Sequence, residues 1–168
     1  MISQTTEYAL RAVVYLAQHS ADSWTTQQIA DATHVPAGYL SKVLQGLSRF
    51  GIVSSQRGRH GGFQLAKPPS EFSVLEIVNA VEPIRRITKC PMDIPSHAGT
   101  LCSLHETLDE AISMIEERFA ATTLEDMTHR KDVASGECVF PLIDVSIMKK
   151  TKVKKGPKRR GRRKKSEL

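Results

Sequence analysis

Apolar residues near the start of the chain recur with the spacing of amphipathic helices. Residues 5–19 show this repeat and predict a first helix that ends near Ser20, with the apolar positions Tyr8, Ala9, Ala12, Val13, Tyr15 and Leu16. Hydroxyl side chains at 25–26 then predict the start of a short second helix, because threonine caps helix N-termini well. Ile29 and Ala30 are expected to face inward, and this helix is expected to end near His34.

A third helix is predicted to open at Val35-Pro36, since proline is tolerated in the first turn of a helix. Gly51 is a natural residue to end it. Between these bounds the apolar residues fall at i, i+3 and i+4 and predict one buried face made of Tyr39, Leu40, Val43, Leu44 and Leu47.

Beyond Gly51 the pattern changes to short strands. Residues 52–55 and 63–65 flank the run Arg57-Gly58-Arg59-His60-Gly61-Gly62, which predicts a hairpin with a basic, glycine-rich tip. Three helices followed by such a hairpin is the element order of a winged helix-turn-helix. The pattern therefore predicts a mainly α fold with a small β-hairpin wing.

Three more elements are expected after the hairpin. Residues 73–81 begin with a Ser-x-x-Glu capping box and predict a fourth helix, whereas residues 84–102 have no sustained period and predict an irregular loop. A final short helix is suggested at 123–126. Before it, residues 103–121 predict a long C-terminal helix with a stripe too apolar to leave in water, made of Leu104, Leu108, Ala111, Ile112, Ile115 and Phe119.

The predicted fold points to double-stranded DNA as a partner. In a winged helix-turn-helix the third helix enters the major groove, and the wing reaches the adjacent backbone or minor groove. The candidate DNA contacts are therefore polar side chains of the second helix, the third helix and the wing: Thr26, Gln27, Gln28, Tyr39, Ser41, Lys42, Gln45, Arg57, Arg59 and His60. The alternative for the third-helix residues is a solvated face without a partner.

The net charge of +6 is unevenly distributed over the 168 residues. Residues 149–168 carry 12 of the 24 lysines and arginines and one acidic residue, so residues 1–148 have a net charge of −5. DNA affinity of the folded part must therefore come from local clustering. The basic end is predicted to be a disordered cation that binds phosphates without sequence preference, and a merely solubilising role is the alternative.

Several classes of function are disfavoured by the sequence. The first twenty residues lack the pattern of an export signal, and no apolar run is long enough for a membrane span, so a cytoplasmic location without membrane contact is expected. No phosphate-binding loop, metal-binding histidine pair or nucleophile elbow is found, which argues against an enzyme and against a small-molecule substrate. A non-specific nucleic-acid-packaging or RNA-binding protein is a weaker alternative, because the part before the tail is acidic.

Three cysteines, Cys90, Cys102 and Cys138, make an odd number, which argues against a disulfide framework. Thiol chemistry, metal chemistry and an ordinary structural role are all compatible with three such residues. Cys138 lies in a poorly patterned segment and is interpreted as a simple thiol.

Taken together, several segments resemble the Rrf-two family of bacterial regulators, which includes the iron-sulfur cluster regulator and the nitric-oxide-sensing repressor. The resemblance covers roughly residues 1–130 and is carried by residues 6–11 of the first helix, 39–40 of the third, 53–63 of the wing and 78–82 of the fourth helix. It implies a homodimer joined through the long helix, in which two third helices read a roughly palindromic site. The domains expected are a winged helix-turn-helix at 1–82, a cysteine-containing sensor loop at 83–102, a dimerisation helix region at 103–130 and a flexible tail at 131–168.

The resemblance also implies a candidate iron-sulfur cluster. Cys90 matches the first of three cysteine ligands in many members, Cys102 matches the last, and His105 matches a histidine that follows it in some. The expected middle cysteine falls near Ser96, and serine is a poor ligand for iron. In the nitric-oxide sensors an acidic residue of the partner's first helix can serve as a ligand, and Glu7 holds that position here.

Two interpretations of this loop follow. In the first, Cys90, Cys102, His105 and Glu7 of the partner subunit hold a cluster, with two irons rather than four, that senses iron, nitric oxide or redox state; His97 is another possible ligand. In the second, the chain is a cluster-free regulator of the same fold that responds to a thiol, a metabolite or a protein partner. In the first interpretation, binding or loss of the cluster would cause a population shift that changes the spacing or orientation of the two third helices.

Overall fold

The computed structural model describes residues 2–58, 61–92 and 99–129. Its elements are α1 (Gln4–Gln18), α2 (Thr26–Thr33), α3 (Ala37–Arg49), β1 (Val53–Gln56), β2 (Gly62–Leu65), the 3-10 helix η1 (Pro69–Glu71), α4 (Val74–Val81), α5 (Ser103–Ala120) and α6 (Leu124–His129). The mainly α fold with one hairpin is thus confirmed, and each predicted helix is present. The short helix η1 is the one element here that the periodicity did not predict.

Helix boundaries follow the predicted capping chemistry. Thr25 caps α2, and Gln28 completes the box by accepting from the Thr25 backbone N–H, at 2.9 Å. Ser73 caps α4, and Glu76 accepts from the Ser73 N–H at 2.7 Å. The third helix ends before Gly51, whose φ of +71° is the left-handed conformation that glycine adopts without strain.

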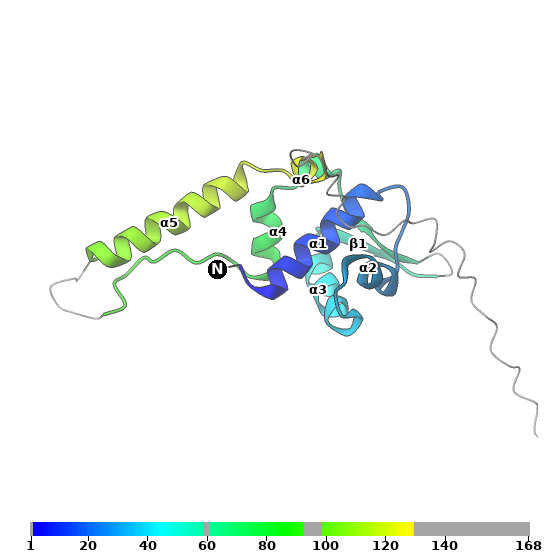
Figure 1. Cartoon of the computed structure of the whole chain (residues 1–168), viewed down its shortest axis with the longest axis horizontal. Helices are drawn as coiled ribbons and strands as arrows, with labels where there is room; N and C mark the ends of the chain where they lie inside the picture. The colour runs from blue at the N-terminus through cyan, green and yellow to red at the C-terminus, as the bar shows by residue number, and fades with distance from the viewer. Residues whose placement is uncertain (1, 59–60, 93–98, 130–168) are drawn as a thin grey trace, which may run out of the picture.

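The hydrophobic core lies among α1, α2, α3 and α4, which pack together in the body of the molecule (Figure 1), and it also includes Val53 of β1 and Leu124 of α6. Its largest fully buried side chains include Tyr15, Leu16, Ile29, Leu40, Leu44, Leu47 and Ile77. Ile29 and Ala30 face inward as expected. The expectation that Tyr39 belongs to the buried face of α3 is wrong: its side chain is 42% exposed, because it lies at the edge of the face formed by Leu40, Val43, Leu44 and Leu47.

The wing is an antiparallel pair in which Val53 faces Leu65 and Gln56 faces Gly62. A third short segment joins it, since Trp24 and Phe63 exchange two backbone hydrogen bonds of 3.0 and 2.8 Å. A Cβ atom on Gly62 would lie 2.6 Å from the Trp24 carbonyl oxygen, so this close approach requires glycine. The wing is therefore fastened to the chain between α1 and α2.

After α4 the chain leaves the body and returns along α5 (Figure 1). Residues 83–92 and α5, termed here the arm, run side by side in opposite directions, and residues 83–92, 99–102 hold no regular element, as the sequence predicts. At the end of α5 the chain rejoins the body, where Leu124 of α6 is fully buried beside α1. No helix within the described ranges has the length and apolarity needed to cross a bilayer.

Candidate DNA interface and cysteine-histidine site

One face of α3 is polar and open to solvent. Gly38, Lys42, Gln45 and Arg49 are all exposed and follow one another at intervals of four, three and four residues. Such spacing places them on one side of the helix, opposite the buried Leu40, Val43, Leu44 and Leu47. Ser41, predicted on this face, is half-buried.

Arg49 was not selected from the sequence, although its place seven residues after Lys42 could have identified it. The exposed face of α3 therefore offers two cations rather than one.

The second helix contributes fewer open side chains than the sequence suggested, whereas the described part of the wing contributes Arg57 as expected. Gln28 serves the cap of α2, and the side chain of Gln27 donates to Asp31 at 2.7 Å. Thr26 is half-buried, whereas Arg57 at the end of β1 is exposed. Gly58 turns the chain there with a φ of +116°. Arg59 and His60 lie outside the described residues.

Tyr39 connects the first turn of α3 to α1. Its hydroxyl is hydrogen-bonded to that of Thr5, and its ring stands edge-on to Tyr8, with the two centroids 5.7 Å apart. The guanidinium of Arg11 lies 5.7 Å from the Tyr8 ring centre and is paired with Glu7 one turn earlier. This polar and aromatic seam lies beside the candidate DNA-reading face.

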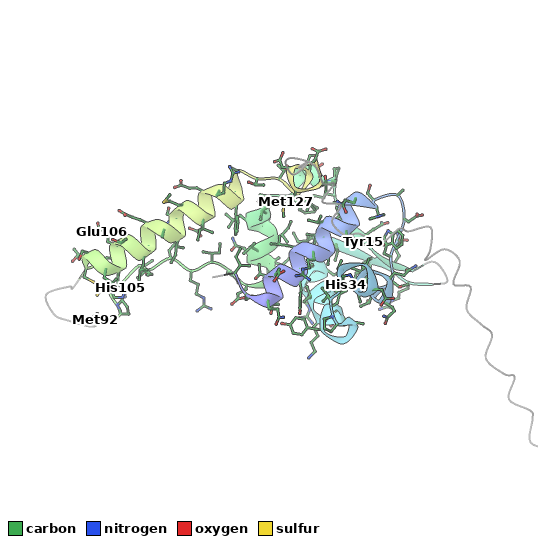
Figure 2. The ribbon with its side chains drawn as sticks, in the orientation of Figure 1. Tyr15, His34, Met92, His105, Glu106 and Met127 are labelled. Carbon is green, nitrogen blue, oxygen red and sulfur yellow. The ribbon has the colours of Figure 1, made fainter. Side chains whose placement is uncertain are left out.

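At the far end of the arm, the structure brings together three of the predicted ligands. The Cys90 and Cys102 sulfurs are 3.9 Å apart, and His105 Nδ1 lies 3.6 Å from the first and 3.1 Å from the second. His105 projects from the first turn of α5, at the end of that helix most distant from the body (Figure 2). The sulfurs are too far apart for a disulfide, whose bond is about 2.05 Å long.

These distances fit three ligands of one tetrahedral metal ion. With metal–sulfur and metal–nitrogen bonds of about 2.3 and 2.05 Å, tetrahedral angles place two sulfurs about 3.8 Å apart and a sulfur and a nitrogen about 3.5 Å apart. Two thiolates and an imidazole are a donor set for zinc or iron rather than for magnesium or calcium. A two-iron cluster carries two protein ligands on each iron, so one of the three would have to move outward to fit it.

The environment of Cys102 favours its thiolate. The backbone N–H of His105, followed by the His105 side chain and the Cys90 thiol, lowers the pKa of Cys102 to about 7. A thiolate is the form that binds metals and acts as a nucleophile, and a cysteine at a helix N-terminus is a recurrent setting for it. The site is therefore poised for metal or thiol chemistry near neutral pH.

The remaining predicted ligands are not part of this group within one chain. Glu7 lies on α1 and is paired there with Arg11. Ser96, His97 and Cys138 lie outside the described residues.

The arm leaves apolar surface uncovered. Leu104, Leu108, Met114 and Ile115 of α5 are 62%, 46%, 70% and 46% exposed. Ile112 and Phe119 are half-buried and line a pocket of about 250 Å³ between the arm, α4 and the start of α1, together with Ile2, Val78 and Ile84. Most of the predicted stripe thus remains unpacked in a single chain.

Charged groups along the arm were also missed from the sequence. Arg86 pairs with Asp109 and Glu116 of α5, across 23 and 30 positions. Such long-range pairing has no local signal, unlike the i, i+4 pairs within a helix.

Known proteins resemble this chain both in sequence and in structure. The profile of the Rrf2 family, described as iron-dependent transcriptional regulators, matches residues 2–130. An HTH-type transcriptional regulator of Aquifex aeolicus (strain VF5) is 32% identical over 130 residues, which cover 76% of this chain and 90% of that protein.

Among solved structures, CymR (YrzC), the global cysteine regulator of B. subtilis, superposes with a TM-score of 0.65 and 25% identity, covering 79% of this chain and 98% of that one. IscR of T. potens also has a TM-score of 0.65, with 24% identity over 81% of this chain and 93% of its own, and supports the fold. These regulators are not enzymes, and the resemblance predicted from the sequence is confirmed. The chain belongs to the Rrf2 family of DNA-binding, winged helix-turn-helix transcriptional regulators.

Proposed function

We propose that this chain is a homodimeric, sequence-specific regulator whose DNA binding is controlled by a metal centre at Cys90, Cys102 and His105. The observation that carries the proposal is the convergence of these three ligand atoms at the outer end of the arm, with mutual distances of 3.1–3.9 Å. Cys102 and His105 lie at the start of α5, the helix that we expect to join the two subunits. A change in ligation would thus act directly on the element that sets the spacing of the two third helices.

The DNA-contacting surface is proposed to be the exposed face of α3 together with the wing. Replacing Lys42, Arg57 and Arg59 by alanine should weaken binding to every duplex, because each cation contacts phosphate or base edges. Arg85→Ala, which removes a cation from the arm, is the control. Unchanged affinity of the triple variant for all duplexes would overturn this assignment. Competition with random duplex separates a regulator, which prefers one palindrome by orders of magnitude, from a packaging protein.

The dimer is proposed to form through the apolar face of α5. Exposed leucine, methionine and isoleucine side chains on one long helix typically mark a protein interface, and a two-fold interface pairs the same patch of both copies. Sedimentation velocity should give a dimer for the native chain and a monomer for Ile115→Glu. Glu110→Gln, a change at an exposed polar position of α5, should leave the dimer intact. A monomeric native chain would contradict the proposal.

The metal centre admits two forms. The ligand distances favour a single tetrahedral ion, whereas the family resemblance favours a two-iron cluster with Glu7 of the partner subunit as a further ligand. Anaerobic purification followed by a visible spectrum and assays of metal and acid-labile sulfide decides between them. A cluster contains iron and sulfide and absorbs in the visible range, while a single ion comes without sulfide.

A cluster-free thiol regulator is the second candidate. It is favoured by the neighbouring sulfurs of Cys90 and Cys102, by the lowered pKa of Cys102, and by the similarity to the global cysteine regulator of B. subtilis. Absence of metal after anaerobic purification, combined with DNA affinity that depends on the oxidation state of the thiols, would support this candidate and contradict the metal centre.

A further inference from the structure

Arg86, four residues before Cys90, contacts α5 through a bidentate salt bridge with Asp109. Its Nε donates to Oδ1 at 2.8 Å and its Nη2 to Oδ2 at 2.6 Å. The backbone N–H of Ile87 donates to the same Oδ1 at 2.7 Å. Three donors therefore converge on one carboxylate, and the planar guanidinium sets the orientation of the pair as well as its separation.

The pair is supported further along α5. Arg86 Nη1 donates to Ser113 Oγ at 3.0 Å and to Glu116 Oε2 at 3.4 Å. Asp109, Ser113 and Glu116 are spaced by four and three residues, so they form one row on α5. The Asp109 side chain is only 16% exposed, and hydrogen bonds from Arg86 hold the pKa of Asp109 below its usual range. The carboxylate is therefore ionised throughout the physiological pH range.

The position of this pair relative to the ligands is what suggests a role. Asp109 follows His105 by four residues, a rise of about 6 Å along the helix, and Cys90 is within about 14 Å of Arg86 even when the chain between them is fully extended. Cys90 belongs to a segment without regular structure, whereas Cys102 and His105 belong to the start of α5. Anchoring Arg86 on α5 restricts the volume that Cys90 can search, so that closing the site costs less conformational entropy.

We propose that Arg86 and Asp109 form a clasp that positions Cys90 beside Cys102 and His105 before any metal or cluster is bound. Both are positioning residues, because neither touches the ligand atoms. The proposal rests on the proposed function only in assuming that the site binds a metal or cluster. The positioning of Cys90 itself is a property of the chain without metal.

The test measures thiol proximity in the apo protein, using the full chain with Cys138→Ser so that two thiols remain. Phenylarsine oxide is the probe, because one arsenic condenses with two neighbouring thiols, forming two As–S bonds and releasing water. Arg86→Gln and Asp109→Asn should each weaken this capture by about fivefold or more, in line with the loss of a preorganised pair. Arg86→Lys keeps the positive charge but cannot form the bidentate pair with Asp109. Its capture of the arsenical should therefore lie between that of the native chain and that of Arg86→Gln.

Three controls separate positioning from general damage. Arg85→Gln makes the same change one residue away, at an arginine that forms no ion pair with any described residue. This variant should capture phenylarsine oxide as well as the native chain does. In a Cys90→Ser background, where the Cys90 thiol no longer affects Cys102, alkylation of Cys102 by iodoacetamide should be unchanged by Arg86→Gln, as should the melting temperature of the winged domain. The exchanged pair, Arg86→Asp with Asp109→Arg, should recover part of the capture.

The outcomes are distinguishable. Native-like capture by both Arg86→Gln and Asp109→Asn would overturn the clasp while leaving the metal centre in place. If the native chain captures the arsenical no better than Cys90→Ser does, the two thiols do not meet, which would overturn the assembled site and with it the proposed sensing function.

Discussion

The hydroxyl of Tyr39, in the first turn of α3, is hydrogen-bonded to the hydroxyl of Thr5 on α1. The contact joins the helix proposed to read DNA to the N-terminal helix that carries Glu7. Because α1 also contacts α2, α4 and α6, a displacement of α1 would be transmitted to the start of α3. Tyr39 is thus a structural link as well as a candidate DNA contact.

Two substitutions of Tyr39 should separate its hydroxyl from its ring. Tyr39→Phe loses one exposed hydrogen bond and should lower the free energy of unfolding by no more than about 1 kcal/mol. Tyr39→Ala also loses the edge-on contact with Tyr8, which adds about 0.5–1.5 kcal/mol. Urea unfolding measures both. Tyr8→Phe, which affects a hydrogen bond within α1 only, is the control, and equal losses for the two Tyr39 variants would contradict this account.

The capping box of α4 should make stability depend on pH. The backbone N–H and hydroxyl of Ser73 donate to Glu76 and lower the pKa of its carboxyl. A lowered carboxyl pKa stabilises the fold above the unfolded value, about 4.3, and this contribution is lost as the pH falls through the folded value. Ser73→Ala should therefore cost about 1 kcal/mol at pH 7 and progressively less in acid.

The box of α2 provides a matched control for that experiment. Thr25 pairs there with Gln28, which does not titrate. Thr25→Ala should lower the free energy of unfolding by a similar amount at pH 7. Because Gln28 does not titrate, the part of this loss that comes from the Thr25–Gln28 pair should be the same in acid. Identical pH profiles for the two alanine variants, measured by urea unfolding, would show that ionisation of Glu76 has no part in the cap.

In the chain without metal, the pH at which Cys102 alkylation reaches half its maximal rate should be lower than for an ordinary thiol. Because its pKa is about 7, the rate of reaction with iodoacetamide should reach half its maximum near neutral pH. His105→Ala removes the imidazole but keeps the backbone N–H, so the midpoint should rise only part of the way to the ordinary thiol value of about 8.5. Mass spectrometry assigns the alkylated site, and a midpoint near 8.5 in the native chain would refute the expectation.

Gly62→Ala should detach the wing from the chain before α2. The new Cβ would lie 2.6 Å from the carbonyl oxygen of Trp24, so the two backbone hydrogen bonds between Trp24 and Phe63 must lengthen. We expect a loss of about 1–3 kcal/mol in the free energy of unfolding. Gly46→Ala is the contrasting control: its Cβ meets open space within α3, and it should stabilise by about 0.5–1 kcal/mol.

Deleting residues 149–168 should weaken binding to all DNA about equally. This segment contains 12 of the 24 lysines and arginines, and each phosphate neutralised adds about 0.9 to the slope of log affinity against log salt. The deletion should therefore flatten the slope without changing the preference for the specific site. Fluorescence anisotropy over a series of salt concentrations measures this slope. An unchanged slope after the deletion would mean that the tail has no role in DNA binding.

The positions of most helices follow from local patterns of residue type. Amphipathic periodicity placed α1–α3 and α5 within a few residues, and the Ser73–Glu76 and Thr25–Gln28 boxes set helix starts, because capping acts between residues three positions apart. The sequence also identified Cys90, Cys102 and His105, through residue type and family resemblance. The assignment of Tyr39 failed because helical spacing alone does not show where a face ends.

Contacts between residues far apart in the chain, in contrast, depend on the packing of the folded protein. Three contacts join residues that are 23 or more positions apart. They are the approach of Trp24 to Gly62, the burial of Leu124 in the core and the bidentate pair between Arg86 and Asp109. Contacts of this kind depend on how whole elements pack, and no local pattern encodes them. The same applies to the cysteine-histidine site: the sequence supplies Cys90, Cys102 and His105 as candidate ligands, and the antiparallel course of the arm sets the distances between them.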